Sequence, residues 1–438
     1  MTRTDTLTPA LESFRARVAP LRPVRVVGRV RRLLDNRIEV AGLSGTASLG
    51  DELVIGAAPG TLRAEVVALD PDTVTAMPCG PTDGLRIGAR VECAGPPALT
   101  PSDGWLGRIV DPFGRPLDDR PLAPGRRRAL HADPPSPGAR GGFGPRLATG
   151  YIALDTMLPV TEGQRLGVFA GSGVGKSRLL GDLARRMEAD VVVIALVGER
   201  GREVSGFARD VLGREGMART VIVAATSDRA ANVRRRCVPA ALAVAEHFRD
   251  RGLRVLLLAD SLTRHAEAHR DVVAATTGTD PGPMPAGLAS DLAALVERAG
   301  PGEGGKPGIT AVLTVLVAGS DMEEPVADTV RGLLDGHVVL SRAIAESGRY
   351  PAIDILASVS RALPDCASDP ENAAIVAARR TLETLRRNEL MITSGLYEAG
   401  RDPAIDDALK RRDRLEGVLA GRSEGIPESF AALNGAVG

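Results

Sequence analysis

A glycine-rich segment of eight residues, AGSGVGKS from Ala170 to Ser177, constrains the possible folds more than any other feature of the chain. It follows the apolar run QRLGVFA and opens the helical pattern SRLLGDLARRM, which is the order of strand, loop and helix that a phosphate-binding loop requires. Glycines let backbone N–H groups turn inward around an anion, and the dipole of the following helix adds positive potential. We therefore expect nucleotide phosphates to be bound by Gly171, Ser172, Gly173, Val174, Gly175, Lys176, Ser177 and Arg178.

Three side chains are predicted to complete the contacts with phosphate and metal. Lys176 would contact the β- and γ-phosphates of ATP, and the Ser177 hydroxyl would bind Mg²⁺. A phosphate-bound Mg²⁺ needs an acidic group at the end of a neighbouring strand, and Asp260 closes the apolar run VLLLAD. Asp260 could also cap the helix that follows it. Ala170 stands where the motif usually has glycine, but a methyl group there requires only a negative φ.

Hydrolysis also needs a group that orients or deprotonates a water molecule. Glu199 follows the apolar run VVVIALVG, at the carboxyl end of an expected strand, where open α/β sheets bind ligands. Nearby phosphates and Mg²⁺ would hold its carboxylate ionised. An acidic residue after a strand is more often simply solvated, so the pattern alone leaves both interpretations open. Arg200 and Arg202 beside it would position the site.

The pattern along the chain predicts several structural regions. Residues 1–20 could form an amphipathic helix, either a frayed terminus or a docking element for a partner. From residue 22 to about 91, short strand-like runs alternate with Gly, Asp and Pro, as in a small all-β barrel or sandwich. Residues 112–145 are rich in Pro, Gly and Arg and resemble an extended connector. Beyond them, apolar runs alternate with helical patterns, which indicates a parallel sheet covered on both faces, and after about residue 369 only helical patterns remain.

The composition argues against several classes of protein. Lys plus Arg (55) balances Asp plus Glu (55), and aromatic residues make up 3 %, so the basic and aromatic surface of a nucleic-acid motor is not indicated. The four cysteines are scattered, which suggests neither a zinc site nor a disulfide framework. No apolar stretch approaches the roughly 18 residues of a membrane span, and the start lacks a signal-peptide pattern. We therefore expect a cytoplasmic protein that does not bind nucleic acid.

Several longer segments, taken together, resemble one family. In chain order they are GQRLGVFAGSGVGKS, LVGERGREV, VLLLADSLTR and YPAIDILASVSR. They are similar to the ATPase subunits of rotary ATP synthases and, more closely, to the flagellar and type III protein-export ATPases. PAIDILASVS, from Pro351 to Ser360, matches the signature of that superfamily, and further segments extend the likeness over nearly the whole chain. AGSGVGKS and DSLTR favour the flagellar ATPases over synthase subunits and, more narrowly, over the injectisome ATPases.

The resemblance implies an α/β fold, with a RecA-like P-loop NTPase core, an N-terminal β-barrel and a C-terminal helical domain. It also implies a homohexameric ring with ATP bound between subunits. The expected bounds are 1–20 for a partner-binding helical segment, 21–95 for the barrel, 96–369 for the ATPase domain including a connector at 96–150, and 370–438 for the helical domain.

The resemblance also assigns roles to single residues. Glu199 falls on the catalytic glutamate of the family, next to Arg200. Arg361 falls on the arginine finger, which reaches the γ-phosphate of the neighbouring subunit, and a guanidinium suits this role because it spreads its charge over several oxygens. Tyr350 falls where a tyrosine stacks on adenine, although it could instead be a core aromatic next to Pro351.

A member of this family would use ATP and Mg²⁺ to energise protein export at the inner-membrane export apparatus. The implied partners are a coiled-coil regulator, a central stalk protein, export gate membrane proteins and chaperone–substrate complexes. The alternatives are an injectisome ATPase and a rotary synthase catalytic subunit, and the SLTR sequence argues against the latter. A ring subunit that binds nucleotide without hydrolysis is disfavoured, because Glu199 and Arg361 are both present.

Two features depart from the family pattern. The segment 276–291 (TTGTDPGPMPAGLASD) lacks the aromatic residue of the family's pore-facing loop and the Pro-Arg that usually follows it. His265 stands where an aromatic residue is common. Both departures concern pore contacts and coupling rather than nucleotide chemistry.

Overall fold

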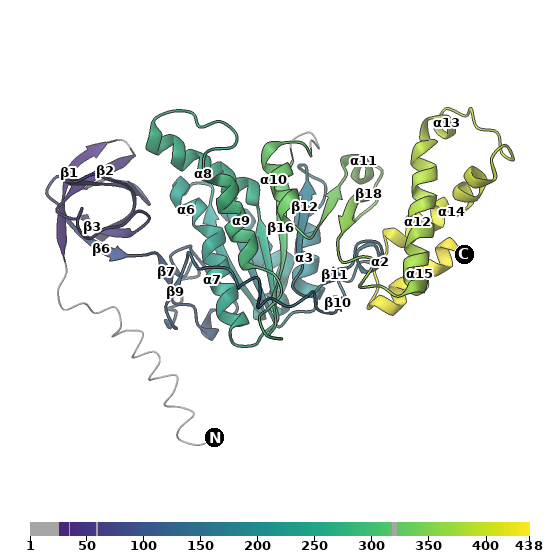
Figure 1. The fold of residues 1–438 in the computed structure, drawn as a ribbon, viewed down its shortest axis with the longest axis horizontal. Coiled ribbons are helices and arrows are strands. Elements are labelled where there is room, and N and C mark those ends of the chain that lie inside the picture. The colour runs from purple at the N-terminus through teal and green to yellow at the C-terminus, as the bar shows by residue number, and fades with distance from the viewer. Residues whose placement is uncertain (1–25, 35, 58–59, 318–321) are drawn as a thin grey trace, which may run out of the picture.

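The computed structural model describes residues 26–34, 36–57, 60–317 and 322–438. Three regions follow one another along its long axis (Figure 1): a barrel of strands, a central sheet covered by helices, and a group of helices at the opposite end. The partner-binding helix expected over residues 1–20 lies outside the described residues. Within the described part of the chain, no helix is both long enough and apolar enough to cross a bilayer.

Six antiparallel strands close into a barrel, in the order β1-β2-β5-β4-β3-β6. Buried and partly exposed residues alternate along β2, because successive side chains of a strand point to opposite faces. Ile38, Val40 and Leu53 are among the apolar residues that fill the interior. Of the two all-β alternatives, the barrel is therefore correct and the sandwich is wrong. The strands are β1 (Val27–Leu34), β2 (Arg37–Ala41), β3 (Glu52–Ala57), β4 (Gly60–Leu69), β5 (Thr73–Pro78) and β6 (Arg90–Gly95).

An eight-stranded sheet forms the central layer, in the order β18-β17-β12-β16-β15-β13-β14-β8. Neighbouring strands are parallel, as predicted, except that β18 runs antiparallel to β17 at one edge. The carboxyl ends of β12, β13 and β15 therefore meet on the same side. The strands are β8 (Arg108–Val110), β12 (Arg165–Ala170), β13 (Val191–Glu199), β14 (Thr220–Thr226), β15 (Val255–Asp260), β16 (Ile309–Leu316), β17 (Gly336–Leu340) and β18 (Ile353–Ser360).

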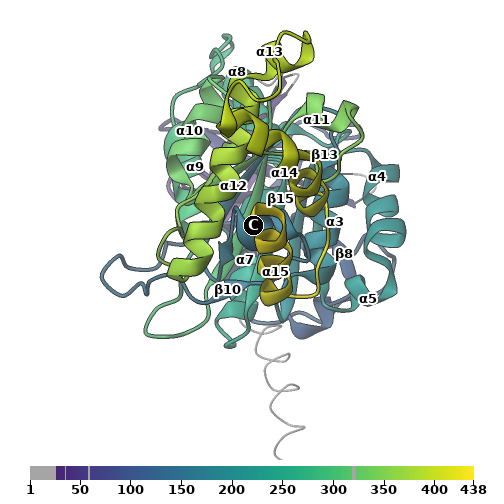
Figure 2. The same cartoon turned by 90° about the vertical axis from the view of Figure 1, so that its right-hand side faces the viewer.

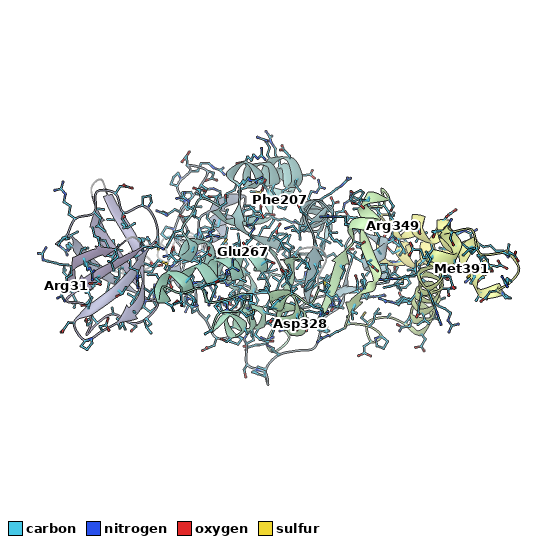
Figure 3. All side chains as sticks on the ribbon, turned by 90° about the horizontal axis from the view of Figure 1, so that it is seen from above. Arg31, Phe207, Glu267, Asp328, Arg349 and Met391 are labelled. Atoms are coloured by element: carbon cyan, nitrogen blue, oxygen red, sulfur yellow. The ribbon has the colours of Figure 1, made fainter. Side chains whose placement is uncertain are left out.

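Helices cover both faces of this sheet, and each face has its own apolar core. α7, α9 and α10 contribute to one core, and α2 and α3 to the other. Figure 3 shows Phe207, from a π-helical turn, and Asp328, from α10, on opposite sides of the layer. The helices are α2 (Ile152–Thr156), α3 (Lys176–Arg186), α4 (Gly201–Gly206), the π-helical turn (Phe207–Leu212), α5 (Gly213–Ala218), α6 (Ala231–Arg235), α7 (Cys237–Arg249), α8 (Leu262–Thr277), α9 (Leu288–Arg298), α10 (Pro325–Leu333) and α11 (Arg342–Glu346).

Part of the expected connector over residues 96–150 belongs to the folded core. β8 pairs with β14 at the edge of the sheet, and Trp105 and Leu130 are buried in the adjoining core. A strand of three residues is too short to show a periodic pattern, so the Pro and Gly content of the region concealed it. The other short elements are β7 (Ala98–Leu99), a 3-10 turn (Asp103–Trp105), β9 (Arg128–Ala129), β10 (Arg146–Leu147) and β11 (Val160–Thr161).

Four helices form the C-terminal region, which faces the viewer in Figure 2. α12 begins at a capping box, in which the side chains of Ser368 and Glu371 each accept a backbone hydrogen bond, and a proline lies in the first turn. α15 packs on α2 and buries Phe430 and Leu433 in the core beneath α3. The helices are α12 (Asp369–Arg387), α13 (Glu389–Thr393), α14 (Pro403–Leu419) and α15 (Ile426–Val437).

Candidate active site

The glycine-rich loop lies between the end of β12 at Ala170 and the start of α3 at Lys176. Gly173 and Gly175 have φ angles of 80° and 88°, a left-handed conformation that residues with a Cβ rarely adopt. A Cβ on Gly175 would also lie 3.2 Å from the ring of Tyr350. Ala170 has a negative φ, so its methyl group causes no backbone strain. The sequence and the observed conformation therefore agree on a loop that can turn its N–H groups towards an anion.

Lys176 and Asp260 meet at the carboxyl edge of the sheet. The Lys176 ammonium donates a hydrogen bond to Asp260 Oδ1, and the Thr314 hydroxyl donates to the same oxygen over 2.8 Å. Asp260 is buried, and the Lys176 side chain is only 13 % exposed. Ser261 rather than Asp260 caps α8, because the Ser261 hydroxyl accepts the hydrogen bond from the backbone of Arg264. The Asp260 carboxylate is therefore free of the capping role that was its alternative.

Glu199 ends β13, the strand next to the one that carries Asp260. Burial raises the pKa of Glu199 to about 7, and a hydrogen bond with Glu203 and the charge of Asp260 act in the same direction, whereas Lys176 opposes them. The hydrogen bond with Glu199 in turn lowers the pKa of Glu203, which is exposed on α4. The protein surroundings of Glu199 therefore raise its pKa towards neutral pH, and the ionising effect of bound phosphates and Mg²⁺ stays a prediction.

Other predicted residues lie at the surface of this site. Ser172, Ser177 and Arg178 are exposed, whereas Val174 is buried below the loop. Arg200 is exposed as well, and its guanidinium lies 3.2 Å from Glu203, the carboxyl group that is hydrogen-bonded to Glu199.

Tyr350 lies beside the loop and lines a cavity of about 100 Å³. It is 44 % exposed, which is inconsistent with the alternative that it is a core aromatic. Its ring contacts the position of Gly175, so a flat base held against Tyr350 would place its phosphates near the loop. The other lining residues are Tyr151, Val174, Arg178, Leu179, Leu340, Pro351, Ala352 and Arg422.

Arg361 lies at the end of the sheet that is opposite to the phosphate loop, where the parallel strands begin. It follows Ser360, which pairs with Gly336 at the start of β17, whereas Leu340 at the end of β17 pairs with Ala170. The two ends of β17 are about 13 Å apart, at roughly 3.3 Å per residue. Arg361 is exposed, and its side chain forms no hydrogen bond or ion pair with the residues that the structure describes. The structure therefore does not bring Arg361 to the phosphate loop of its own chain.

The oxygen donors at the loop fit a nucleotide-bound Mg²⁺. Mg²⁺ usually takes one or two carboxylates from the protein and completes its shell with water and substrate phosphates. Asp260 and Ser177 supply one carboxylate and one hydroxyl at the same edge of the sheet. Within the described ranges, no group of three His, Cys, Asp or Glu side chains is arranged as a metal site by itself, so a metal here would need the phosphates.

Comparisons with known proteins agree with this geometry. A family model described as "ATP synthase alpha/beta family, nucleotide-binding domain" matches residues 150–360, and one described as "T3SS EscN ATPase C-terminal domain" matches residues 367–426. A flagellum-specific ATP synthase of Caulobacter vibrioides is 40 % identical, over 97 % of this chain and 98 % of its own length. The chain belongs to the flagellar and type III secretion ATPases of this family.

Both branches of these ATPases are similar to the chain. A type 3 secretion system ATPase of Xanthomonas euvesicatoria is also 40 % identical, with 94 % of each chain covered. The structure of the assembled ATPase EscN in complex with its central stalk EscO, from enteropathogenic E. coli, matches with a TM-score of 0.85 and 36 % identity, covering 94 % of this chain and 100 % of that one. The predicted fold class and ATPase activity are confirmed, and the similarity does not separate flagellar from injectisome members.

Sequence reasoning missed three residues that shape the site of this ATPase. Glu203 was present in the quoted segment LVGERGREV, and its spacing of four residues from Glu199 could have indicated one helical turn between them. Thr314 lies in a continuous apolar run, where a single hydroxyl gives little signal. Arg422 follows α14, far along the chain from the loop, and no motif includes it.

Proposed function

We propose that the chain is one subunit of a homohexameric ring that hydrolyses MgATP to energise protein export, and that the exported proteins are flagellar components. The division of the site between two edges of the sheet carries this proposal. Lys176, Glu199 and Asp260 lie at one edge and Arg361 at the other. A ring that sets one edge against the opposite edge of the next copy completes the site at every interface. The assembled state of EscN, with which the chain shares its fold, supports this arrangement.

In such a site the residues of the chain have distinct tasks. Lys176 neutralises charge on the β- and γ-phosphates, and Glu199 accepts a hydrogen bond from the attacking water and orients it. Arg361 of a neighbouring copy stabilises the charge that develops on the transferred phosphoryl group. Mg²⁺ held by Ser177 and Asp260 would add further charge neutralisation at the phosphates. Tyr350 holds the adenine at the outer end of the loop.

The flagellar assignment and the partners rest on similarity. The segments AGSGVGKS and DSLTR favour flagellar members, whereas the overall identity of 40 % is the same for the flagellar relative and the type 3 secretion relative. We infer a cytoplasmic enzyme, peripheral at the inner-membrane export apparatus. Residues 1–20 bind a coiled-coil regulator, and a central stalk protein binds the ring, as EscO binds EscN. The other partners are export gate membrane proteins and chaperone–substrate complexes.

The proposal is tested in the bacterium that encodes the chain. Replacement of the chain by its Lys176→Ala variant should abolish export of hook and filament proteins into the medium, because the ring binds its partners without turnover. A Lys410→Ala variant, which removes an exposed lysine of α14, is the matched control and should export normally. Normal flagellar export in the Lys176→Ala strain, with loss of proteins delivered into host cells, would instead assign the chain to an injectisome.

A further inference from the structure

One arginine connects the C-terminal helices to the nucleotide site. Arg422 lies in the segment between α14 and α15, and its Nη2 donates hydrogen bonds to the carboxylate of Asp182 and, over 3.2 Å, to the hydroxyl of Tyr151. Its Cζ lies 5.0 Å from the centroid of the Tyr151 ring, within the range of a cation–π contact. The side chain thus binds the nucleotide domain by three polar or aromatic contacts.

One partner of Arg422 lies on the helix that follows the phosphate loop. Asp182 lies on α3, the helix that begins at Lys176, and its side chain is 1 % exposed. Burial would raise the pKa of Asp182, but hydrogen bonds from Tyr151 and Arg185 and the charge of Arg422 lower it on balance. A buried carboxylate is costly unless it is paired, so Asp182 depends on Arg422 and Arg185 for charge compensation.

Arg422 also borders the cavity assigned to the base. The cavity of about 100 Å³ is lined by Tyr350, Gly175 and Arg178 on the side of the loop and by Tyr151 and Arg422 on the side of the C-terminal helices. Other contacts between these helices and the nucleotide domain lie away from it. The Ser429 hydroxyl, for example, donates to Asp155 over 3.1 Å, and neither residue lines the cavity.

We propose that Arg422 is a positioning residue of the nucleotide site, through which the C-terminal helices hold the wall of the base pocket. A displacement of the α14–α15 segment withdraws the guanidinium from Tyr151 and Asp182, which loosens the wall that contacts the base. By reciprocity, binding of the base holds that segment in place. This inference rests on the proposed function, since it takes the cavity beside Tyr350 to be the site of the adenine.

The experiment compares two ligands that share phosphates and differ in the base. Affinities of the full chain for MgATP and for magnesium tripolyphosphate are measured for the unmodified protein, Arg422→Ala and Arg422→Lys. Arg422→Ala should weaken MgATP binding about tenfold, the scale of a lost hydrogen bond to a charged group, and change tripolyphosphate binding less than about twofold. Arg422→Lys should recover part of the loss, because it keeps the charge without the planar fork.

Two further variants keep the test decisive. Arg414→Ala removes an exposed arginine that donates to the Gly435 carbonyl over 3.3 Å and ties α14 to α15, so it should leave both affinities unchanged. Tyr151→Phe serves as the test if Arg422→Ala fails to fold, because it keeps the ring and removes the hydroxyl. It should weaken MgATP binding more than tripolyphosphate binding, by a smaller factor than Arg422→Ala. In the unmodified protein, ATP should slow amide exchange over residues 420–425, and tripolyphosphate should not.

Each outcome bears on one claim. An equal loss of affinity for MgATP and for tripolyphosphate would overturn the inference, because it would show that Arg422 only stabilises the packing of the helices. Unchanged affinity for MgATP in Arg422→Ala would overturn it as well. Failure of the unmodified chain to bind MgATP at all would instead refute the proposed function, so the two failures are distinguishable.

Discussion

Mixing two inactive variants should restore ATPase activity if Arg361 acts across a subunit boundary. Lys176→Ala removes the positive charge that contacts the phosphates. Arg361→Ala removes the arginine finger, which typically contributes about 10³–10⁵-fold to the rate. The two residues belong to opposite edges of one sheet, and the ends of β17 that mark these edges are about 13 Å apart. A guanidinium does not extend that far from its own backbone, so neither defect can be repaired within one chain.

The expected recovery follows from the arrangement of a ring. A competent interface needs an intact loop from one copy and an intact finger from the next. In a ring assembled at random from equal amounts of the two variants, each condition holds with probability one half, so about one quarter of the interfaces are competent. Phosphate release should therefore reach up to about a quarter of the unmodified rate, and less where neighbouring sites must act in sequence.

The assay is phosphate release from variants that are mixed, assembled with nucleotide and checked for co-assembly by two affinity tags. The control mixes Lys176→Ala with a Lys176→Ala/Arg361→Ala double variant, which offers no interface with both groups and should stay inactive. Absence of recovery despite co-assembly would refute the reasoning, and so would full activity of a chain shown to be monomeric. Near-normal turnover of Arg361→Ala alone would show that Arg361 is only a surface charge.

The remaining predictions concern the phosphate site, Glu199 and residues 1–20. Lys176→Ala should reduce phosphate release to background and weaken ATP binding, and Asp260→Asn should first abolish the dependence of nucleotide affinity on Mg²⁺; near-normal turnover in either variant contradicts the phosphate site. Glu199→Gln should bind ATP in equilibrium dialysis but lose about 10²–10⁴-fold in turnover. Because burial raises the pKa of Glu199 to about 7 and the water-orienting form is the carboxylate, kcat/KM of the unmodified enzyme should fall as the pH drops through about 7, and the glutamine variant should lack that dependence. Lost ATP binding with retained turnover in this variant would make Glu199 structural. Deletion of residues 1–20 should leave basal ATPase activity intact and remove a coiled-coil regulator, because Leu7, Leu11, Phe14 and Val18 would form an apolar stripe; co-purification of the regulator with the truncated chain rules this out.

The features that could best be predicted from the sequence are those that a single contiguous segment specifies. The loop from Ala170 to Ser177 carries its strand, its glycines and its helix in one segment, so its conformation follows from local rules. Asp260 was found because it ends an apolar strand, and its exact partners, Thr314 and the Lys176 ammonium, came only from the packing of neighbouring strands. Periodicity gives the type of an element but not its partner in space.

The features that the sequence did not predict depend on contacts between distant segments. β18 is rich in apolar residues like the other strands, and only its pairing with β17 shows that it runs in the opposite direction. This reversal places Tyr350 at the phosphate-loop end of the sheet and Arg361 at the far end. Likewise, the raised pKa of Glu199 depends first on its burial and then on Glu203 and Asp260, and all three arise only in the folded chain. Titration is a property of the assembled site rather than of any motif.

The two departures from the family pattern form one structural unit. His265 is fully buried, and its Nε2 lies 2.8 Å from Asp291 Oδ2, while His269 Nδ1 lies 3.4 Å from the same oxygen. Asp291 is the last residue of the altered segment 276–291. Burial alone would raise the pKa of Asp291, but hydrogen bonds from the two histidines lower it well below its usual range.

This polar contact ties α8 to α9 below the loop that joins them. Removing Asp291 would leave the side chains of two histidines on α8 without their carboxylate partner, and burying unpaired polar groups is costly. α8 starts directly after Asp260 and Ser261 at the nucleotide site and ends at Thr277, where the altered loop begins. α8 therefore connects the predicted metal ligand to the altered loop, with His265 near the start of the helix and the altered segment at its end.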